Sequence, residues 1–241
     1  MKYIKNIFPY LFWIFLILFL NLFSIYKCFS FTNNSLYNLI NKHKGYDTLK
    51  YYLDIPESEV HHISDDLQKY ILGEKENLDT YVTLLNPSGV KIAFYNDKSS
   101  FHMKEVRDII VGFKNLSYII ISLSIIFFIL TKKTSDNFIF YLQKSLKRVL
   151  IMYILFLVIL AMFCATNFDL FFIKIHEIFF NNDLWIFDPR YEYIICLLPE
   201  ELFFELAVRI LLMMLTTILL LVVALVYLSY LSKTQLRQVT K

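Results

Sequence analysis

Glycine and cysteine are scarce in this chain, and their scarcity excludes several kinds of enzyme. Only four glycines occur among 241 residues, and none belongs to a glycine-rich loop of the kind that cradles phosphate groups. The G-x-S-x-G elbow of many serine hydrolases is absent as well. The three cysteines have no C-x-x-C spacing and no neighbouring histidine, so thiol catalysis has no support. An enzyme built from this sequence would need acid–base chemistry without a protein nucleophile.

Charge is also scarce, because Asp, Glu, Lys and Arg make up 19% of the chain while hydrophobic residues make up 57%. A typical soluble domain has about 25% charged residues. Four stretches approach the roughly 20 apolar residues that cross a bilayer core, and none contains a charged side chain. They are residues 7–26, 115–131, 149–166 and 210–230. The chain is therefore predicted to be a polytopic membrane protein.

Basic residues are concentrated at alternate ends of these stretches. With the N-terminus inside, the inner segments carry ten basic residues and one acidic residue, whereas the outer segments carry a net charge of −6. Lys and Arg near span ends favour the cytoplasmic side, so both termini are predicted to be cytoplasmic. No small-x-small cleavage site follows the first stretch, which we interpret as an uncleaved helix. The basic residues form no single patch, so nucleic acid is not an expected partner.

The predicted fold is an all-α membrane protein: a four-transmembrane-helix bundle with an extracytoplasmic, mostly helical cap that contains a small β-hairpin. In chain order the predicted segments are transmembrane helix 1 (1–26), the extracytoplasmic cap (27–114), transmembrane helix 2 (115–131), a cytoplasmic loop (132–148), transmembrane helix 3 (149–166), an extracytoplasmic interfacial segment (167–209), transmembrane helix 4 (210–230) and a cytoplasmic tail (231–241). Cys28 and Cys164 lie near outer span ends, and we expect them to be buried free thiols.

The outer segments contain local signals for secondary structure. A helix is predicted between Pro56 and Gly73, with apolar residues at helical spacing. The Asn-Pro-Ser-Gly turn at 86–89 predicts a β-hairpin between the apolar stretches that flank it. A second helix should begin near Phe101 and run directly into transmembrane helix 2. The charged, Phe-rich stretch 168–180 is too short to span and suits a helix in the membrane interface.

Two of the five histidines, His102 and His176, are predicted to lie at the same outer membrane face, each beside phenylalanine. Histidine can accept and donate a proton near neutral pH, because its ordinary pKa is about 6.5. The alternative is that each is an interfacial side chain that reaches toward the headgroups. The run His-His-Ile-Ser-Asp-Asp at 61–66 resembles a metal site but lacks a further ligand, and a solvated helix face is the preferred interpretation. His43 is predicted to be a surface residue.

The residues around both histidines resemble the lipoprotein intramolecular transacylases of bacteria, the Lit family. The resemblance rests on His-Met-Lys-Glu-Val at 102–106, His-Glu-Ile-Phe-Phe at 176–180, Trp-Ile-Phe-Asp-Pro at 185–189 and Leu-Pro-Glu at 198–200. The first motif differs from the family by Glu in place of Asp. Asn181-Asn182 stands where the family often has glycine, and Phe203-Phe204 stands where Phe-Trp is common.

The resemblance implies acyl transfer within one substrate, from the sn-2 position of a diacylglyceryl-cysteine to the α-amino group of the same cysteine. It implies a protein of the bacterial cell membrane that acts on diacylglyceryl-modified lipoproteins and membrane lipid and needs no cofactor. The implied catalytic residues are His102 and His176. The sequence leaves open which of them is the base, and our hypothesis is that His102 is the base and His176 the acid. The candidate substrate-binding residues are Met103, Phe179, Phe180, Trp185, Phe187, Phe203 and Arg209.

Arg209 also lies four residues after Glu205, and the two are expected to form an ion pair at the outer end of the fourth span. Two other functions stay open at the level of sequence. One is a non-catalytic membrane receptor or scaffold with a ligand-binding cap. The other is a metal-dependent membrane hydrolase that uses residues 61–66.

Overall fold

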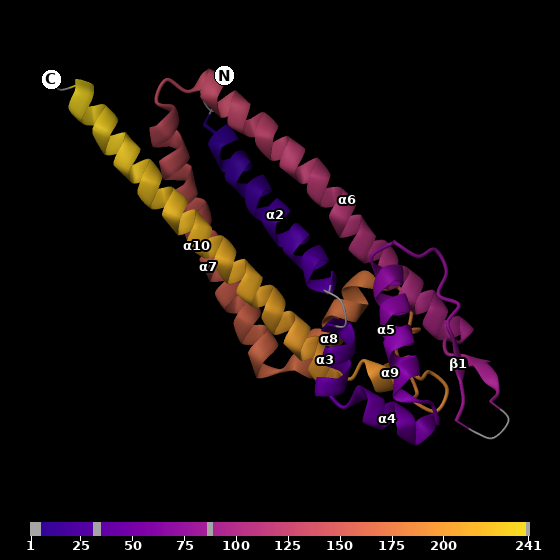
Figure 1. The fold of residues 1–241 in the computed structure, drawn as a ribbon. Coiled ribbons are helices and arrows are strands. Elements are labelled where there is room, and N and C mark those ends of the chain that lie inside the picture. Colours follow the sequence, from indigo (N-terminus) through magenta and orange to yellow (C-terminus); the bar gives the residue numbers. More distant parts are fainter. Residues whose placement is uncertain (1–5, 31–34, 86–88, 240–241) are drawn as a thin grey trace. The chain divides into compact units, whose positions relative to one another are not determined.

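A computed structural model describes residues 6–30, 35–85 and 89–239 (Figure 1). The chain is mostly helical and divides into two compact units. The first unit comprises residues 1–24, 113–166 and 210–241, and the second comprises residues 25–112 and 167–209. The elements are α2 (Phe8–Phe29), α3 (Ser35–Lys42), α4 (Gly45–Tyr52), α5 (Glu57–Ile71), β1 (Tyr81–Thr83), β2 (Lys91–Ala93), α6 (Asp97–Thr134), α7 (Phe138–Thr166), α8 (Phe168–Phe179), α9 (Ile194–Leu197) and α10 (Glu200–Val239).

Long apolar helices make up the first unit. In the part of the chain that the structure describes, four helices are long and apolar enough to cross a membrane, namely α2, α6, α7 and α10. Outward-facing side chains such as Met152 and Ile159 are 71% and 68% exposed, which is the pattern of a surface that lipid covers. The predicted all-α fold with four membrane helices is therefore confirmed.

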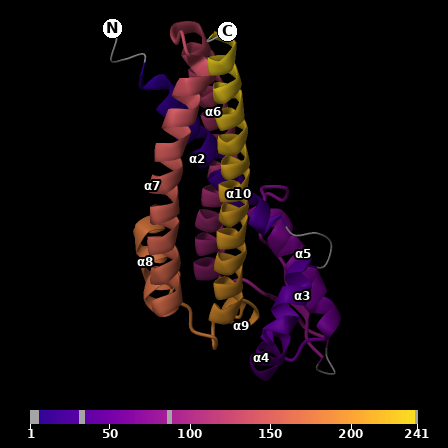
Figure 2. The same ribbon diagram turned by 90° about the vertical axis from the view of Figure 1, so that its left-hand side faces the viewer.

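Polar side chains join the helices of the first unit to one another. The Trp13 indole N–H donates to the backbone carbonyl of Leu142 at 3.1 Å, which connects α2 to α7. The Gln143 amide donates to Ser229 Oγ at 3.0 Å, and α7 and α10 run side by side in both views of the ribbon (Figure 2). Each bond satisfies a polar group that would otherwise be buried in an apolar surrounding, and such bonds contribute to helix association in membranes.

The second unit has its own apolar core, built by α3, α4, α5, α9 and the ends of longer helices. Helix α5 follows Pro56 and buries one face, as predicted, and Gly73 with φ of 75° lies just beyond its end. Gly45 allows α4 to pack closely on α9, since a Cβ there would lie 2.8 Å from the carbonyl oxygen of Leu197. Among the largest fully buried side chains are Ile40, Leu49, Ile63, Leu67, Ile194, Leu197 and Leu202.

The predicted β-hairpin and the predicted helix that enters the second span are both confirmed, but their first and last residues differ from the predicted ones. Strands β1 and β2 pair antiparallel with Val82 opposite Ile92, and each has only three residues. Residues 86–88 of the predicted turn lie outside the described residues. Helix α6 begins at Asp97, four residues before Phe101, and continues without a break to Thr134. The expected buried free thiols are confirmed for Cys28 and Cys164.

Candidate active site

Two helices of the second unit carry the predicted histidines. His102 lies in the second turn of α6, and His176 lies in the last turn of α8. Helix α8 begins where the Asn167 side chain accepts a hydrogen bond from the backbone N–H of Leu170 at 2.9 Å, which is an ordinary N-cap. The two imidazole centroids are 6.0 Å apart, and the ring planes differ by 27°. Residues 74 positions apart in sequence are thus brought to one place.

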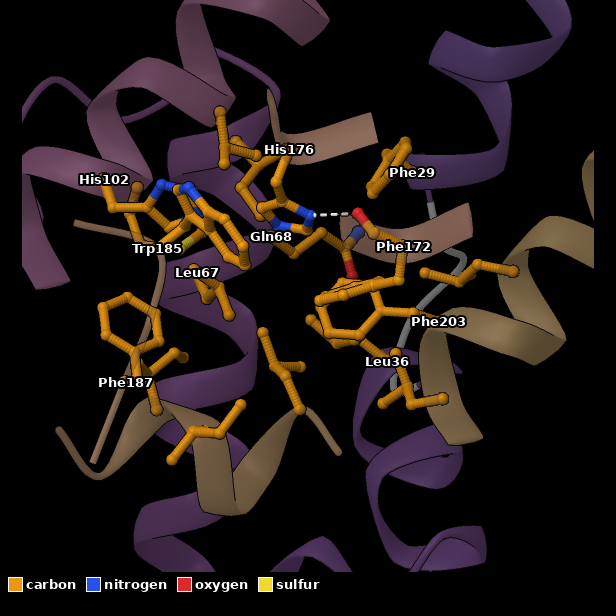
Figure 3. Close-up of a pocket in the computed structure, with 18 residues that line it drawn as sticks. Phe29, Leu36, Leu67, Gln68, His102, Phe172, His176, Trp185, Phe187 and Phe203 are labelled. Carbon is orange, nitrogen blue, oxygen red and sulfur yellow. Dashed lines mark hydrogen bonds between the residues drawn. The ribbon is translucent and has the colours of Figure 1, made fainter. Parts of the chain in front are cut away.

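A cavity of about 120 Å³ lies beside the two rings, and all of its lining residues belong to the second unit (Figure 3). The ring centroid of His176 is 4.7 Å from that of Trp185 and 4.2 Å from that of Phe172. Phe187 contacts the other imidazole, with its ring centroid 5.5 Å from that of His102. The lining residues are Phe29, Leu36, Leu67, Gln68, Ile71, His102, Met103, Val106, Phe172, His176, Trp185, Phe187, Ile194, Ile195, Leu198, Leu202, Phe203 and Leu206.

The hydrogen bond of His176 determines which of its ring nitrogens carries a proton. Its Nδ1 lies 2.8 Å from the backbone carbonyl oxygen of Phe172 (Figure 3). A carbonyl only accepts, so Nδ1 carries the proton and Nε2 of the neutral ring keeps its lone pair. Burial lowers the pKa of His176 below its ordinary value, and the bond to Phe172 opposes this shift only in part. The ring is therefore neutral near pH 7 and able to accept a proton.

Most of the predicted substrate-binding residues meet at this cavity. Met103, Trp185, Phe187 and Phe203 line it. Phe180 does not line it but is buried, with its ring centroid 4.7 Å from that of His102 and 5.5 Å from that of His176.

Like Phe180, the predicted substrate-binding residues Phe179 and Arg209 lie outside the lining. The Phe179 side chain is 45% exposed. Arg209 pairs with Glu205, as expected, through Nη2 and Oε1 at 2.8 Å.

The loop that carries Trp185 and Phe187 is tied to the start of α6. The Asn96 amide donates to Glu192 Oε1 at 3.1 Å, and Lys98 Nζ donates to the carbonyl oxygen of Ile186 at 2.6 Å. Glu192 is buried, and a buried carboxylate needs such partners to offset its lost hydration. These bonds hold the aromatic side chains of the loop against the helix that bears His102.

Sequence reasoning missed the contribution of α5 and of Phe172. Leu67 and Gln68 of α5 line the cavity, but their spacing indicates only a helix face in a core. Phe172 lies four residues before His176, and this spacing on a predicted helix could have identified it as a neighbour. Glu105 lies on the helix of His102 and accepts a hydrogen bond from Asn182, but the sequence identifies it only as a departure from the family motif.

The alternative metal site at 61–66 is arranged differently. His61 stacks on Tyr37, and His62 is 57% exposed with Nε2 3.9 Å from Asp66 Oδ2. Asp66 accepts hydrogen bonds from Lys75 and Thr80. Within residues 6–30, 35–85 and 89–239, no group of three His, Cys, Asp or Glu side chains has an arrangement that could hold a metal ion.

The prediction that His43 is a surface residue is wrong. Its side chain is 17% exposed, and Nε2 lies 2.8 Å from Glu205 Oε2. Lys42 Nζ contacts the same oxygen at 2.6 Å. The flanking lysines indicated solvent, but His43 follows the end of α3 at Lys42 and is partly buried where its ring meets Glu205.

Comparisons with known proteins give one consistent result. A protein-family model described as "Lipoprotein intramolecular transacylase Lit" matches residues 10–204. Among solved structures, the membrane integral lipoprotein intramolecular transacylase Lit from Bacillus cereus is 21% identical, with a TM-score of 0.71, and the match covers 97% of this chain and 100% of that one. No curated protein matches.

Two histidine variants of the same Bacillus cereus protein also match. The variant with histidine replaced by alanine is 20% identical with a TM-score of 0.66, and 97% of each chain is covered. The variant with arginine in place of histidine is 22% identical with a TM-score of 0.62, and the match covers 98% of this chain and 95% of that one. At these identities the likeness shows the fold alone.

Proposed function

Because the chain belongs to the lipoprotein intramolecular transacylase (Lit) family, we propose that it moves the sn-2 acyl chain of a diacylglyceryl-modified lipoprotein to the α-amino group of that lipoprotein's N-terminal cysteine. The chain is an acyltransferase and an integral membrane protein. The observation that carries the proposal is the pair of imidazoles, 6.0 Å apart, beside a cavity whose lining residues include no serine, threonine or cysteine.

The substrate supplies the nucleophile in this reaction. Its α-amine has an ordinary pKa of about 7.7–8.0, so a fraction is already neutral at pH 7. The amine nitrogen attacks the ester carbonyl, and a base removes one proton from the nitrogen. The tetrahedral intermediate then releases the glycerol oxygen, which takes up one proton. Amide and free hydroxyl are formed, and neither a covalent enzyme intermediate nor a cofactor is required.

We assign the proton transfers to His102 as base and His176 as acid. The ring spacing of 6.0 Å leaves room for the reacting atoms or a bridging water between the imidazoles. A proton taken from the amine by one ring can therefore be returned to the leaving oxygen by way of the other. Positioned acid–base groups contribute about 10²–10⁴-fold to such reactions.

The aromatic side chains that line the cavity would hold the lipid in a folded conformation, in which its ester lies close to its amine. Amine and ester belong to the same cysteine residue, so holding them at attack distance can contribute roughly 7–11 kcal/mol to lowering the barrier. Met103, Trp185, Phe187 and Phe203 supply the contact surface for the acyl and glyceryl groups. Phe179 and Arg209 would contact lipid outside the cavity and not the reacting atoms.

We further infer the membrane topology from the distribution of charge. The excess of Lys and Arg around 132–148 and at both ends of the chain favours cytoplasmic termini. Residues 27–114 and 167–209 would then lie on the outer side of the cell membrane, where lipid-anchored proteins are held. The acceptor amine and both histidines would share that compartment.

A reporter lipoprotein tests the proposal. The chain is expressed in a bacterial host that lacks other lipoprotein N-acyltransferases, and the N-terminal lipopeptide is analysed by mass spectrometry. Wild-type protein should produce the N-acyl, lyso-glyceryl form, and His102→Ala and His176→Ala should each reduce its formation by about 10²-fold or more. His62→Ala is the matched control, since His62 is an exposed histidine of the same unit.

Protein level and thermal stability in detergent are measured for each variant. If folded His102→Ala and His176→Ala both make the product at the wild-type rate, the two-histidine mechanism is wrong. If the wild-type chain leaves the reporter unchanged, the transacylase proposal itself is wrong.

A further inference from the structure

Glu105 lies one helical turn after His102 on α6 and brings a carboxylate close to Nδ1 of the imidazole. Its Oε2 is 3.9 Å from His102 Nδ1. Both atoms are buried, and neither has a hydrogen-bond partner among the residues that the structure describes. His102 lines the cavity and Glu105 does not. A buried acceptor and a buried ring nitrogen without other partners thus face each other.

The second oxygen of this carboxylate is held by the other histidine-bearing segment. Asn182 Nδ2 donates to Glu105 Oε1 at 2.8 Å. Asn182 lies in the loop that follows α8, three residues after the helix ends at Phe179. The Asn182 side chain also accepts from the backbone N–H of Leu184 at 3.0 Å, which fixes its amide orientation. The amide therefore leaves Oε2 as the free oxygen on the His102 side.

We propose that Glu105 is a positioning residue for the transacylation: it holds the proton of neutral His102 on Nδ1 and stabilises the imidazolium that forms when Nε2 accepts the substrate's proton. This inference rests on the proposed function. A lone pair on Nδ1 would face a carboxylate oxygen and be repelled, whereas an N–H there is attracted. The 3.9 Å separation is longer than a hydrogen bond, and catalytic hydrogen bonds are often long without substrate and tighten only when substrate is bound.

The proton balance of the step is simple. One proton leaves the substrate nitrogen and binds His102 Nε2, so that the ring carries one positive charge. The Nδ1 proton stays on the ring and is shared in a charge-assisted hydrogen bond with Glu105 Oε2, which remains ionised. The proton on Nε2 is later passed on and reaches the glycerol oxygen, and the neutral ring is restored.

The same geometry separates the roles of the two histidines. His176 Nδ1 donates to a neutral backbone carbonyl, that of Phe172. His102 Nδ1 faces a carboxylate, and a full negative charge stabilises an imidazolium more than a carbonyl dipole does. Burial and the nearby His176 imidazole lower the pKa of His102 to about 4, so an imidazolium on His102 needs the stabilisation that the carboxylate provides when this ring acts as the base.

The hydrogen bond from Asn182 joins one oxygen of Glu105 to the loop after α8, and the other oxygen has His102 as its ionic contact. In residues 6–30, 35–85 and 89–239, no Lys or Arg forms an ion pair with Glu105, and its ionic contact is with His102. The nearby Lys98 donates instead to the carbonyl oxygen of Ile186 and approaches Glu192. The neighbouring Arg107 donates to the carbonyl oxygen of Glu76.

The experiment compares wild-type protein with Glu105→Gln and Glu105→Asp in purified form with a synthetic diacylglyceryl lipopeptide. Glu105→Gln keeps the shape but removes the charge, and we expect the rate to fall by about 10²-fold. Glu105→Asp keeps the charge one methylene further back and should recover part of that loss. Glu177→Gln is the matched control, since Glu177 lies next to His176 in sequence but is half exposed and pairs with Lys174.

The ring nitrogens of ¹⁵N-labelled histidine provide a readout that a purely structural role would not change. His102, assigned by its loss in His102→Ala, should show Nδ1–H in the wild type and lose this preference in Glu105→Gln. A wild-type His102 with its proton on Nε2 would overturn the inference, even if a variant does not fold. So would a folded Glu105→Gln with the wild-type rate.

The two proposals fail separately. Loss of product in His102→Ala together with an unchanged rate in Glu105→Gln refutes the role of Glu105 and leaves the transacylase proposal intact. Absence of product from the wild-type protein refutes the transacylase proposal. A slow Glu105→Gln that retains the wild-type Nδ1–H signal, with no recovery in Glu105→Asp, would assign Glu105 to packing alone.

Discussion

Replacing Trp185 with alanine should convert part of the acyl transfer into hydrolysis. The Trp185 ring lies 4.7 Å from the His176 ring and lines the small cavity. The same side chain also lines a second, open pocket of about 620 Å³, together with Glu177, Asn181 and other residues of this segment. Trp185 thus separates the small cavity from the larger pocket, and its removal would connect the two. Water from the larger pocket, which has polar lining residues, could then reach the histidines.

The magnitude follows from two effects of losing this ring. Displacing a reacting group by about 1 Å costs on the order of 10²-fold in rate, or about 2.7 kcal/mol. The space vacated by an indole also admits several waters, since each needs about 30 Å³. Trp185 is only partly buried, so the loss of unfolding free energy should be about 2 kcal/mol, below the 3–5 kcal/mol typical of a fully buried tryptophan.

The assay measures the products of a purified reaction by mass spectrometry. Trp185→Ala should form N-acyl lyso product about 10²-fold more slowly. It should also release free fatty acid together with a lyso lipopeptide that keeps one acyl chain on glycerol and a free α-amine. Trp185→Phe should retain most of the transfer, and Tyr191→Ala removes an exposed aromatic side chain of the same loop as a control. Unchanged rate and unchanged partition between the two products in folded Trp185→Ala would refute this role of Trp185.

Three further predictions concern pH and stability. Burial lowers the pKa of His176 below its ordinary value, so the unfolded chain binds a proton at this histidine more readily than the folded chain does. The melting temperature should therefore fall as the pH drops below about 6.5. The rate of acyl transfer should instead rise up to about pH 8, because the ordinary pKa of the acceptor amine is about 7.7–8.0. A rate of acyl transfer that levels off near pH 6 would contradict this. Gly45→Ala should cost about 1–3 kcal/mol in a denaturant titration because of the contact with Leu197, whereas Gly112→Ala, which meets nothing within 4 Å, should be neutral or stabilising.

Local patterns in the sequence were sufficient to predict the helices and the hairpin. Apolar runs of spanning length identify α2, α6, α7 and α10, because a membrane helix must cover its own length with apolar side chains. Pro56 and Gly73 bracket α5, since proline starts a helix and glycine accepts the φ of 75° beyond its end. Motif spacing also predicts His102 and His176 as the candidate catalytic residues.

The partners of these candidates could not be read from local patterns. Phe179 and Phe180 are neighbours in one motif, yet Phe180 is buried against both imidazoles and Phe179 is 45% exposed. The end of α8 decides this difference, because consecutive side chains at a helix terminus point in different directions. His43 could not be placed from local patterns either, because its partner Glu205 is 162 positions away in sequence.

The sequence by itself determined the membrane helices, their charge asymmetry and the types of side chain available for proton transfer. These properties depend on hydropathy, spacing and composition, which are local. Only the tertiary structure decided that Gln68 and Leu67 line the cavity, that Asn182 holds Glu105, and that the free oxygen of Glu105 faces His102. Such relations depend on how segments far apart in sequence pack together, and packing is settled by all contacts of the core at once.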